Sequence, residues 1–194
     1  LANEALWRDV NSNDIASRGQ RWVTPQQART VQLNFSGLRG LLQQAPMERQ
    51  LATRSSPVIL SLPMPDGEFA RFALVESPVM EAGLAAKFPD IRTYAGQGLD
   101  DPNASLRLDI SPKGFHAQVL GANEFYIDPY QVQDEYHYVV YTRTGFGAGK
   151  QYQCGTDGSD PHVAAEVQAK LAGQAPVPKN PAGANLRTYR IAIA

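Results

Sequence analysis

Cys154 is the only cysteine in the 194-residue sequence, and it lies in a Gln153-Cys154-Gly155 step. A lone thiol cannot close an intramolecular disulfide, which leaves metal ligation or reactivity as its chemistry. A catalytic zinc ion with three protein ligands has a fourth position that a thiolate can occupy in place of water. Because glycine lets the backbone enter a narrow cleft, we predict that these three residues form an inhibitory tether for a zinc site on a following domain. The competing interpretation is a small, buried, unreactive thiol.

The three histidines, His116, His137 and His162, are too far apart in the sequence to form a local pair of metal ligands, and there is no His-Glu-x-x-His segment. The fragment itself is therefore expected to hold no zinc and no other cofactor. His116 and His137 fall in predicted strands, where an imidazole with a structural hydrogen-bond partner is the favoured interpretation.

Two further groups of residues have a possible ligand role beside a simpler structural one. Asp100 and Asp101 suggest a calcium loop, but the alternating ligands and the closing Glu are missing, which favours a capped turn. Tyrosines at strand spacing suggest a platform for sugars, although such residues usually pack half-buried with the hydroxyl at the rim. These tyrosines are Tyr126, Tyr130, Tyr136, Tyr138 and Tyr141.

Composition and motifs argue against several classes of function. The formal net charge of -1 gives no basic field for nucleic acid, and no apolar run approaches the length of a membrane span. There is no nucleophile elbow, phosphate-binding glycine loop or Cys-x-x-Cys motif, so we expect no catalysis by this fragment. Leu1 is not preceded by an initiator Met or a signal segment, which is consistent with a secreted protein whose leader has been removed.

The elements that must position these residues are mostly strands. Alternation predicts a strand at 31–35, and turn residues predict hairpins joining 57–62 to 68–75 and 106–110 to 115–119. Further strands are predicted at 125–128 and 136–142, and short helices at 4–10, 36–44 and 81–88, the last in a crossover. The sequence therefore predicts a mainly β (α+β) domain over 1–144, an antiparallel β-sandwich or curved sheet with a few short helices.

After residue 144 the composition changes. A Gly-rich stretch begins an extended C-terminal tether over 145–159 that carries Cys154. Asp160 and Pro161 are a good N-cap and first-turn pair for a helix over 160–172. Three prolines then predict an exposed linker over 173–186, and 187–194 alternates like the first strand of a downstream domain.

Several separate motifs, in order, resemble the N-terminal pro-regions of bacterial reprolysin-like zinc metallopeptidases, secreted metzincins related to the adamalysins. The matching stretches are Ser61-Leu-Pro-Met-Pro-Asp-Gly67, Val75-Glu-Ser-Pro-Val-Met-Glu81, Phe88-Pro-Asp-Ile-Arg-Thr-Tyr-Ala-Gly-Gln-Gly-Leu-Asp-Asp-Pro102, Gly114-Phe-His-Ala117 and Tyr126-Ile-Asp-Pro-Tyr130. The resemblance covers about 5–154 and resumes at 187–194, which is similar to the first strand of the catalytic domain.

This resemblance implies that Cys154 is a cysteine switch, which coordinates the catalytic zinc of the downstream metallopeptidase domain of the same precursor and keeps the enzyme latent. The flanking residues differ from the basic Pro-Arg-Cys and Pro-Lys-Met-Cys forms of related switches. Activation is expected by cleavage in the exposed linker, with Lys179, Asn185 and Arg187 marking the candidate region. The alternatives are an independent β-rich module that binds carbohydrate or protein and, less favoured, an inhibitor of other proteases acting in trans.

Overall fold

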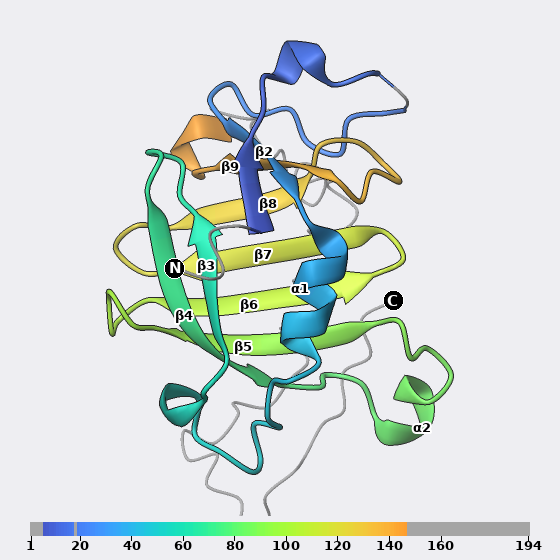
Figure 1. Cartoon of the computed structure of the whole chain (residues 1–194), viewed down its shortest axis with the longest axis vertical. Helices are drawn as coiled ribbons and strands as arrows, with labels where there is room; N and C mark the ends of the chain where they lie inside the picture. Colours follow the sequence, from blue (N-terminus) through green and yellow to red (C-terminus); the bar gives the residue numbers. More distant parts are fainter. Residues whose placement is uncertain (1–5, 18, 147–194) are drawn as a thin grey trace, which may run out of the picture. The chain divides into compact units, whose positions relative to one another are not determined.

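The computed structural model describes residues 6–17 and 19–146. These residues form a single nine-stranded antiparallel sheet. Spatial order along the sheet is β1-β2-β9-β8-β7-β6-β5-β4-β3, so β1 and β3 are its two edges (Figure 1). Strands β3 to β9 form a meander in which each strand pairs with the next. The strands are β1 (Trp7–Asp9), β2 (Arg29–Leu33), β3 (Ile59–Pro63), β4 (Phe69–Glu76), β5 (Arg92–Gly98), β6 (Ser105–Ser111), β7 (Gly114–Leu120), β8 (Phe125–Pro129) and β9 (His137–Tyr141).

Most of the predicted strands are confirmed, and so is the mainly antiparallel β fold. The β3–β4 hairpin pairs Leu60 with Phe72, and the β6–β7 hairpin pairs Leu108 with Ala117. Of the two architectures predicted, the curved sheet is correct, because all nine strands belong to one sheet.

The core lies on the inner side of this curved sheet. Alternate residues of the strands point inward and are almost fully buried, as are three residues of helix α1 (Phe35–Leu42). Asn34 caps α1 through its side-chain oxygen, which accepts the Gly37 N–H at 3.0 Å. The helix crosses the open side of the sheet, opposite β5 to β7 (Figure 1). A single sheet thus buries its apolar face against itself and one helix.

The two edges of the sheet are joined by side chains. The indole Nε1 of Trp7 on β1 donates to the Ser61 carbonyl oxygen on β3 at 2.9 Å. Arg29 on β2 donates to the carbonyl oxygens of Met64 and Glu68, which flank the β3–β4 turn, at 2.9 and 3.1 Å. These contacts close the seam that backbone pairing leaves open.

Three sequence predictions need correction. Residues 4–10 were expected to form a helix, but Trp7–Asp9 is strand β1, because pairing with β2 outweighs the weak helical pattern. The helix predicted at 81–88 is only α2 (Ala82–Ala85), and it connects β4 and β5, which are adjacent antiparallel strands rather than partners in a crossover. Strand β5 was not predicted, since Gly96 and Gly98 lower its β propensity.

Gly96 is nevertheless required by the packing of the sheet. A Cβ atom at this position would come within 2.9 Å of side-chain atoms of both Leu74 and Leu106. The strand therefore uses glycine to let the neighbouring leucines fill the core, which a propensity scale cannot register.

Candidate functional site

The outer face of the sheet carries a row of polar side chains that crosses four strands. Asp109 on β6 lies opposite Thr93 on β5 and His116 on β7 in the strand register. Asp128 on β8 continues the row, with its Oδ1 2.7 Å from His116 Nδ1. These positions alternate with core residues, so the same pleat that buries the inner face places them outward.

Asp128 and His116 form an oriented pair. The Tyr141 hydroxyl donates to Asp128 Oδ2 at 2.7 Å, which fixes the carboxylate whose other oxygen contacts the imidazole. The Trp22 ring lies over His116, with ring centroids 5.0 Å apart and the planes inclined at 51°. Burial, followed by the hydrogen bond to Asp128, raises the pKa of Tyr141, so this hydroxyl remains a donor at neutral pH.

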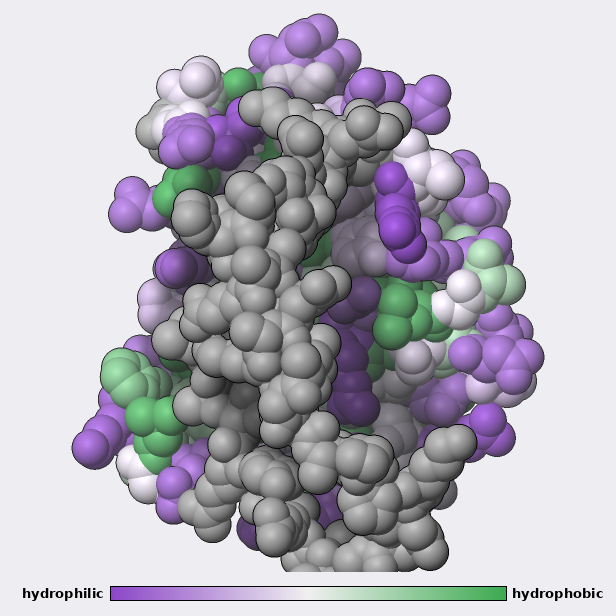
Figure 2. All heavy atoms as spheres, turned by 180° about the vertical axis from the view of Figure 1, so that it is seen from behind, coloured by the Kyte–Doolittle hydropathy of each residue, from purple (hydrophilic) through white to green (hydrophobic). Residues whose placement is uncertain are grey.

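The row lines a depression of about 580 Å³ on the outer face. Its lining also includes Arg107, Gln118, Tyr126, Ser77 and Val79. Figure 2 shows the molecule from behind, and hydrophilic residues predominate among those that it colours. The depression offers carboxylates, an imidazole and an aromatic ring for hydrogen bonding and stacking.

The protonation of Asp109 makes the stability of the β unit depend on pH. Burial, together with the nearby Asp128 charge, raises the pKa of Asp109 above its ordinary value of 3.8, although His116 acts in the opposite direction. A raised folded-state pKa contributes stability that is complete below pH 3.8 and is lost as the pH rises through the folded value. At neutral pH the ionised Asp109 therefore opposes folding.

We predict that Asp109→Asn increases the free energy of unfolding at pH 7 and has a smaller effect at pH 3.8, because the raised pKa lets more of the native carboxyl keep its proton there. Urea unfolding at both pH values, followed by far-UV circular dichroism, measures this. Asp66→Asn, in the exposed β3–β4 turn, is the control. A loss of stability at pH 7 would contradict the assignment.

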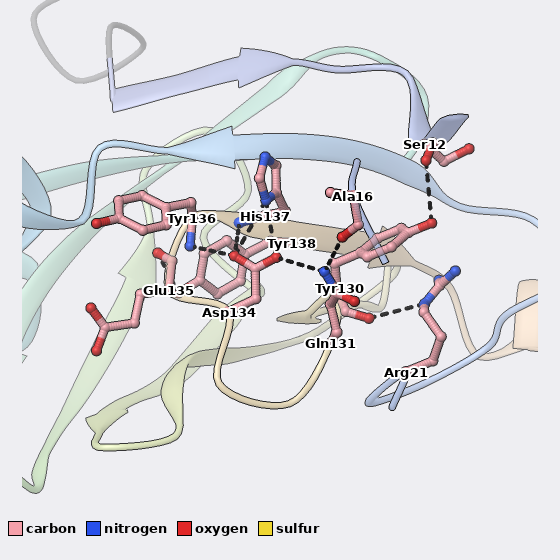
Figure 3. Close-up of polar contacts among 10 residues, drawn as sticks. All are labelled: Ser12, Ala16, Arg21, Tyr130, Gln131, Asp134, Glu135, Tyr136, His137 and Tyr138. Carbon is pink, nitrogen blue, oxygen red and sulfur yellow. Dashed lines mark hydrogen bonds and ion pairs between the residues drawn. The ribbon is translucent and has the colours of Figure 1, made fainter. Parts of the chain in front are cut away.

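A second polar cluster lies in the connection between β8 and β9 (Figure 3). Asp134 Oδ1 accepts the backbone N–H groups of Tyr136 and His137 at 2.9 and 3.0 Å, and His137 Nδ1 lies 3.0 Å from Asp134 Oδ2. Burial acts to raise the pKa of Asp134, but these hydrogen bonds outweigh it and hold the pKa below its ordinary value. Asp134 therefore remains a carboxylate that organises the connection.

The same connection holds a distant part of the chain. Gln131, 3% exposed, donates from Nε2 to the Ala16 carbonyl oxygen at 2.9 Å. Arg21 donates from Nε to the Tyr130 carbonyl oxygen at 2.9 Å, and its guanidinium lies 3.7 Å from the Tyr130 ring centroid. Figure 3 shows these contacts converging from segments far apart in the sequence. The arrangement anchors the stretch before β2 to the β8–β9 connection.

The predicted inhibitory residues lie outside the described part of the chain. These are Gln153, Cys154, Gly155, Lys179, Asn185 and Arg187. The same applies to the tether beyond residue 146, the helix at 160–172, the linker at 173–186 and the strand at 187–194. All of these assignments remain predictions.

The structural interpretations of the two histidines and of the Asp100–Asp101 turn agree with the contacts that these residues make. His116 and His137 each contact an aspartate. Asp101 accepts the Asn103 N–H at 2.9 Å, as expected of a capped turn. The tyrosines differ from one another: Tyr138 is fully buried, whereas Tyr136 is 59% exposed, so they do not form one platform.

Sequence reasoning missed the grouping of Asp109, His116 and Asp128. The signal was present, because a tight turn at Pro112 and Lys113 sets the β6–β7 register and places Asp109 opposite His116. Trp22 could not have been added in this way, since no pattern links its segment to β7.

Comparison with known proteins identified no matching family model, curated protein or solved structure. Within residues 6–17 and 19–146, no three His, Cys, Asp or Glu side chains are grouped so that they could hold a metal ion. None of the helices in this part of the chain combines the length and apolar character needed to span a membrane.

Proposed function

We propose that this chain is the pro-region of a secreted, reprolysin-like zinc metalloendopeptidase, and that it keeps the enzyme latent through Cys154. The observation that carries the proposal is the order of its parts. A self-contained β unit is described as far as Phe146, and the only cysteine of the chain follows shortly afterwards, next to a glycine. The motifs that resemble reprolysin-like pro-regions lie in the same unit and in the same order.

Latency in this proposal depends on one bond and one steric effect. The zinc ion belongs to the downstream catalytic domain, and this chain contributes only the Cys154 thiolate. A thiolate in the fourth position of a catalytic zinc ion displaces the water that the metal would otherwise acidify into a nucleophile. The residues that flank the thiol occupy the cleft in which a substrate peptide would lie.

The β unit would have two roles beside the thiol. By binding the catalytic domain it would hold the tether near the zinc site and so raise the local concentration of Cys154 there, and it would assist folding of that domain. Cleavage near Lys179, Asn185 or Arg187 would break the covalent connection between the pro-region and the catalytic domain. The thiol then competes with substrate as a separate molecule.

The test is inhibition of the mature metallopeptidase by this purified chain. We expect wild-type chain to inhibit, and Cys154→Ala to raise the inhibition constant by about tenfold or more, because the metal–sulfur bond is lost. Asp66→Asn, in the exposed β3–β4 turn, is the control, since it changes a surface side chain and keeps the thiol and its tether. Equal inhibition by wild type and Cys154→Ala would overturn the thiol switch. Inhibition by neither would overturn the proposal that the chain is an inhibitory pro-region.

The alternative of a binding module is favoured by one observation. Val79, Leu84 and Phe88, in the connection around α2, are 79, 46 and 50% exposed. Exposed apolar residues that are close together commonly mark protein-binding surfaces. If this is the main function, Cys154→Ala in the precursor leaves peptidase activity and secretion unchanged, while Phe88→Ser removes the bound protein.

A further inference from the structure

The segment Gly19–Val23 lies against the outer face through contacts with three parts of the β unit. The Val132 N–H donates to the Gln20 carbonyl oxygen at 2.8 Å. Arg21 contacts Tyr130 through its hydrogen bond and its cation–π geometry. Trp22 makes the third contact, with His116. Of these three, only the Trp22 contact involves a group that changes charge near neutral pH.

The surroundings of His116 are strongly electrostatic. Asp109 faces it from β6 and Asp128 from β8, and the Tyr141 hydroxyl on β9 holds the second oxygen of Asp128. The uncharged Thr93 on β5 lies beyond Asp109. Trp22 covers the imidazole from the N-terminal segment. The side chain of His116 is 20% exposed and that of Asp128 is 17% exposed, so water screens their interaction only in part.

The adjacent row supplies the remaining neighbours of His116. Arg107 lies opposite Gln118 in the strand register, and Tyr126 follows on β8. The adjacent row therefore has an exposed cation, Arg107. The row of His116 has two carboxylates, Asp109 and Asp128. A charged imidazole is therefore the cation located between Asp109 and Asp128.

We propose that His116 is a proton-operated clamp that holds the segment Gly19–Val23 on the outer face of the β unit. With its proton, the imidazolium pairs with Asp128, faces Asp109 and attracts the electron-rich Trp22 ring, whose centroid lies 5.0 Å away. Without it, the indole loses its cationic partner, and two carboxylates remain in one row with no positive charge between them. The segment then retains the contacts of Gln20 and Arg21 and the packing of Val23 against Tyr130, Val139 and Tyr141.

The direction of the effect follows from these charges. Imidazole gains its proton between about pH 8 and 5. The clamp is therefore closed at mildly acidic pH and loosened at mildly alkaline pH.

Hydrogen exchange on the full 194-residue chain, measured by mass spectrometry, tests the clamp. After correction for the intrinsic pH dependence of exchange, we expect protection of peptides covering Gly19–Val23 to fall about threefold or more between about pH 5.5 and 7.5. His116→Gln should remove this dependence and leave low protection at both values. Lys113→Gln, in the exposed β6–β7 turn, is the control, because it removes a charge and leaves the contacts of His116 with Asp128 and Trp22 in place.

A second variant and a second signal keep the proposal falsifiable if His116→Gln impairs folding. Asp109→Asn removes one of the two carboxylates that favour the imidazolium, so protection at about pH 7.5 should fall below that of wild type. In a Trp7→Phe background, the emission of Trp22 should also change between the two pH values, and this change should be absent in His116→Gln. Protection that is independent of pH in wild type, or a pH dependence that survives in His116→Gln, would overturn the clamp. The clamp lies within the described β unit, so this result is independent of Cys154 and of the proposed inhibition.

Discussion

Trp7→Ala is expected to lower the free energy of unfolding of the β unit by about 4 kcal/mol, within the range for removing a buried tryptophan. Trp7 is 7% exposed, and its ring lies 5.8 Å from the Phe115 ring and 6.2 Å from the Tyr138 ring, between centroids. It also donates the 2.9 Å hydrogen bond to Ser61 that joins the edge strands β1 and β3. The substitution therefore creates a cavity and removes a connection across the seam.

Urea unfolding followed by far-UV circular dichroism measures this loss without relying on the removed fluorophore. Trp7→Phe keeps an aromatic ring but not the indole N–H, and it should cost about 1–2 kcal/mol beyond the smaller packing change. Val79→Ala, at a 79% exposed position, should stay within about 0.5 kcal/mol of wild type. If Trp7→Ala is no more destabilising than Val79→Ala, the seam is not closed in the way described.

Arg29→Leu is expected to destabilise the β unit by about 2 kcal/mol, on the scale of lost hydrogen bonds from a charged group. Its guanidinium donates to both Asp9 carboxylate oxygens, at 2.6 and 3.0 Å, and to the carbonyl oxygens of Met64 and Glu68. The Arg29 side chain is 12% exposed, whereas that of Asp9 is 66% exposed. The carbonyl contacts should therefore carry more of the effect than the solvated ion pair.

The stabilisation of the fold by Arg29 should also depend on pH, and it should decrease as the pH falls. Its hydrogen bond holds the pKa of Asp9 below the ordinary 3.8, so the pair stabilises the fold above that pH and loses its effect as the pH falls through the folded value. Thermal unfolding of wild type and Arg29→Leu should accordingly differ more at about pH 7 than at about pH 2. Arg54→Leu, which removes one exposed hydrogen bond of 3.2 Å to the Pro102 carbonyl oxygen, is the control. Equal losses in Arg29→Leu and Arg54→Leu would contradict this role.

Local sequence signals were sufficient to predict most of the strands. In β6 and β7, Leu106, Leu108 and Ile110 face the core together with Phe115 and Val119, and the turn between them sets the register. Alternation and turn chemistry depend on neighbours in sequence, and for this reason they can be read from it. Strand β5 could not be predicted in this way, because Gly96 is explained only by the leucines packed across it and Gly98 by the close approach of Asp101 and Ala104.

The candidate functional residues also include some that the sequence could predict and some that required the folded structure. Cys154 and its flanking residues were selected by residue type, and their role is a chemical prediction that the described part of the chain does not reach. The Asp109–His116 juxtaposition was implicit in the hairpin register. The Trp22 contact required a segment that approaches β7 from elsewhere in the fold.

The sequence by itself determined the fold class, the two main hairpins, α1 and the chemistry that a single thiol can perform, because each depends on residue type or on spacing within a few positions. Only the tertiary structure decided that nine strands form one curved sheet, that Trp7 and Arg29 close its seam, and that Trp22 covers His116 between two aspartates. These features join residues far apart along the chain, and shape and charge in the folded state select them.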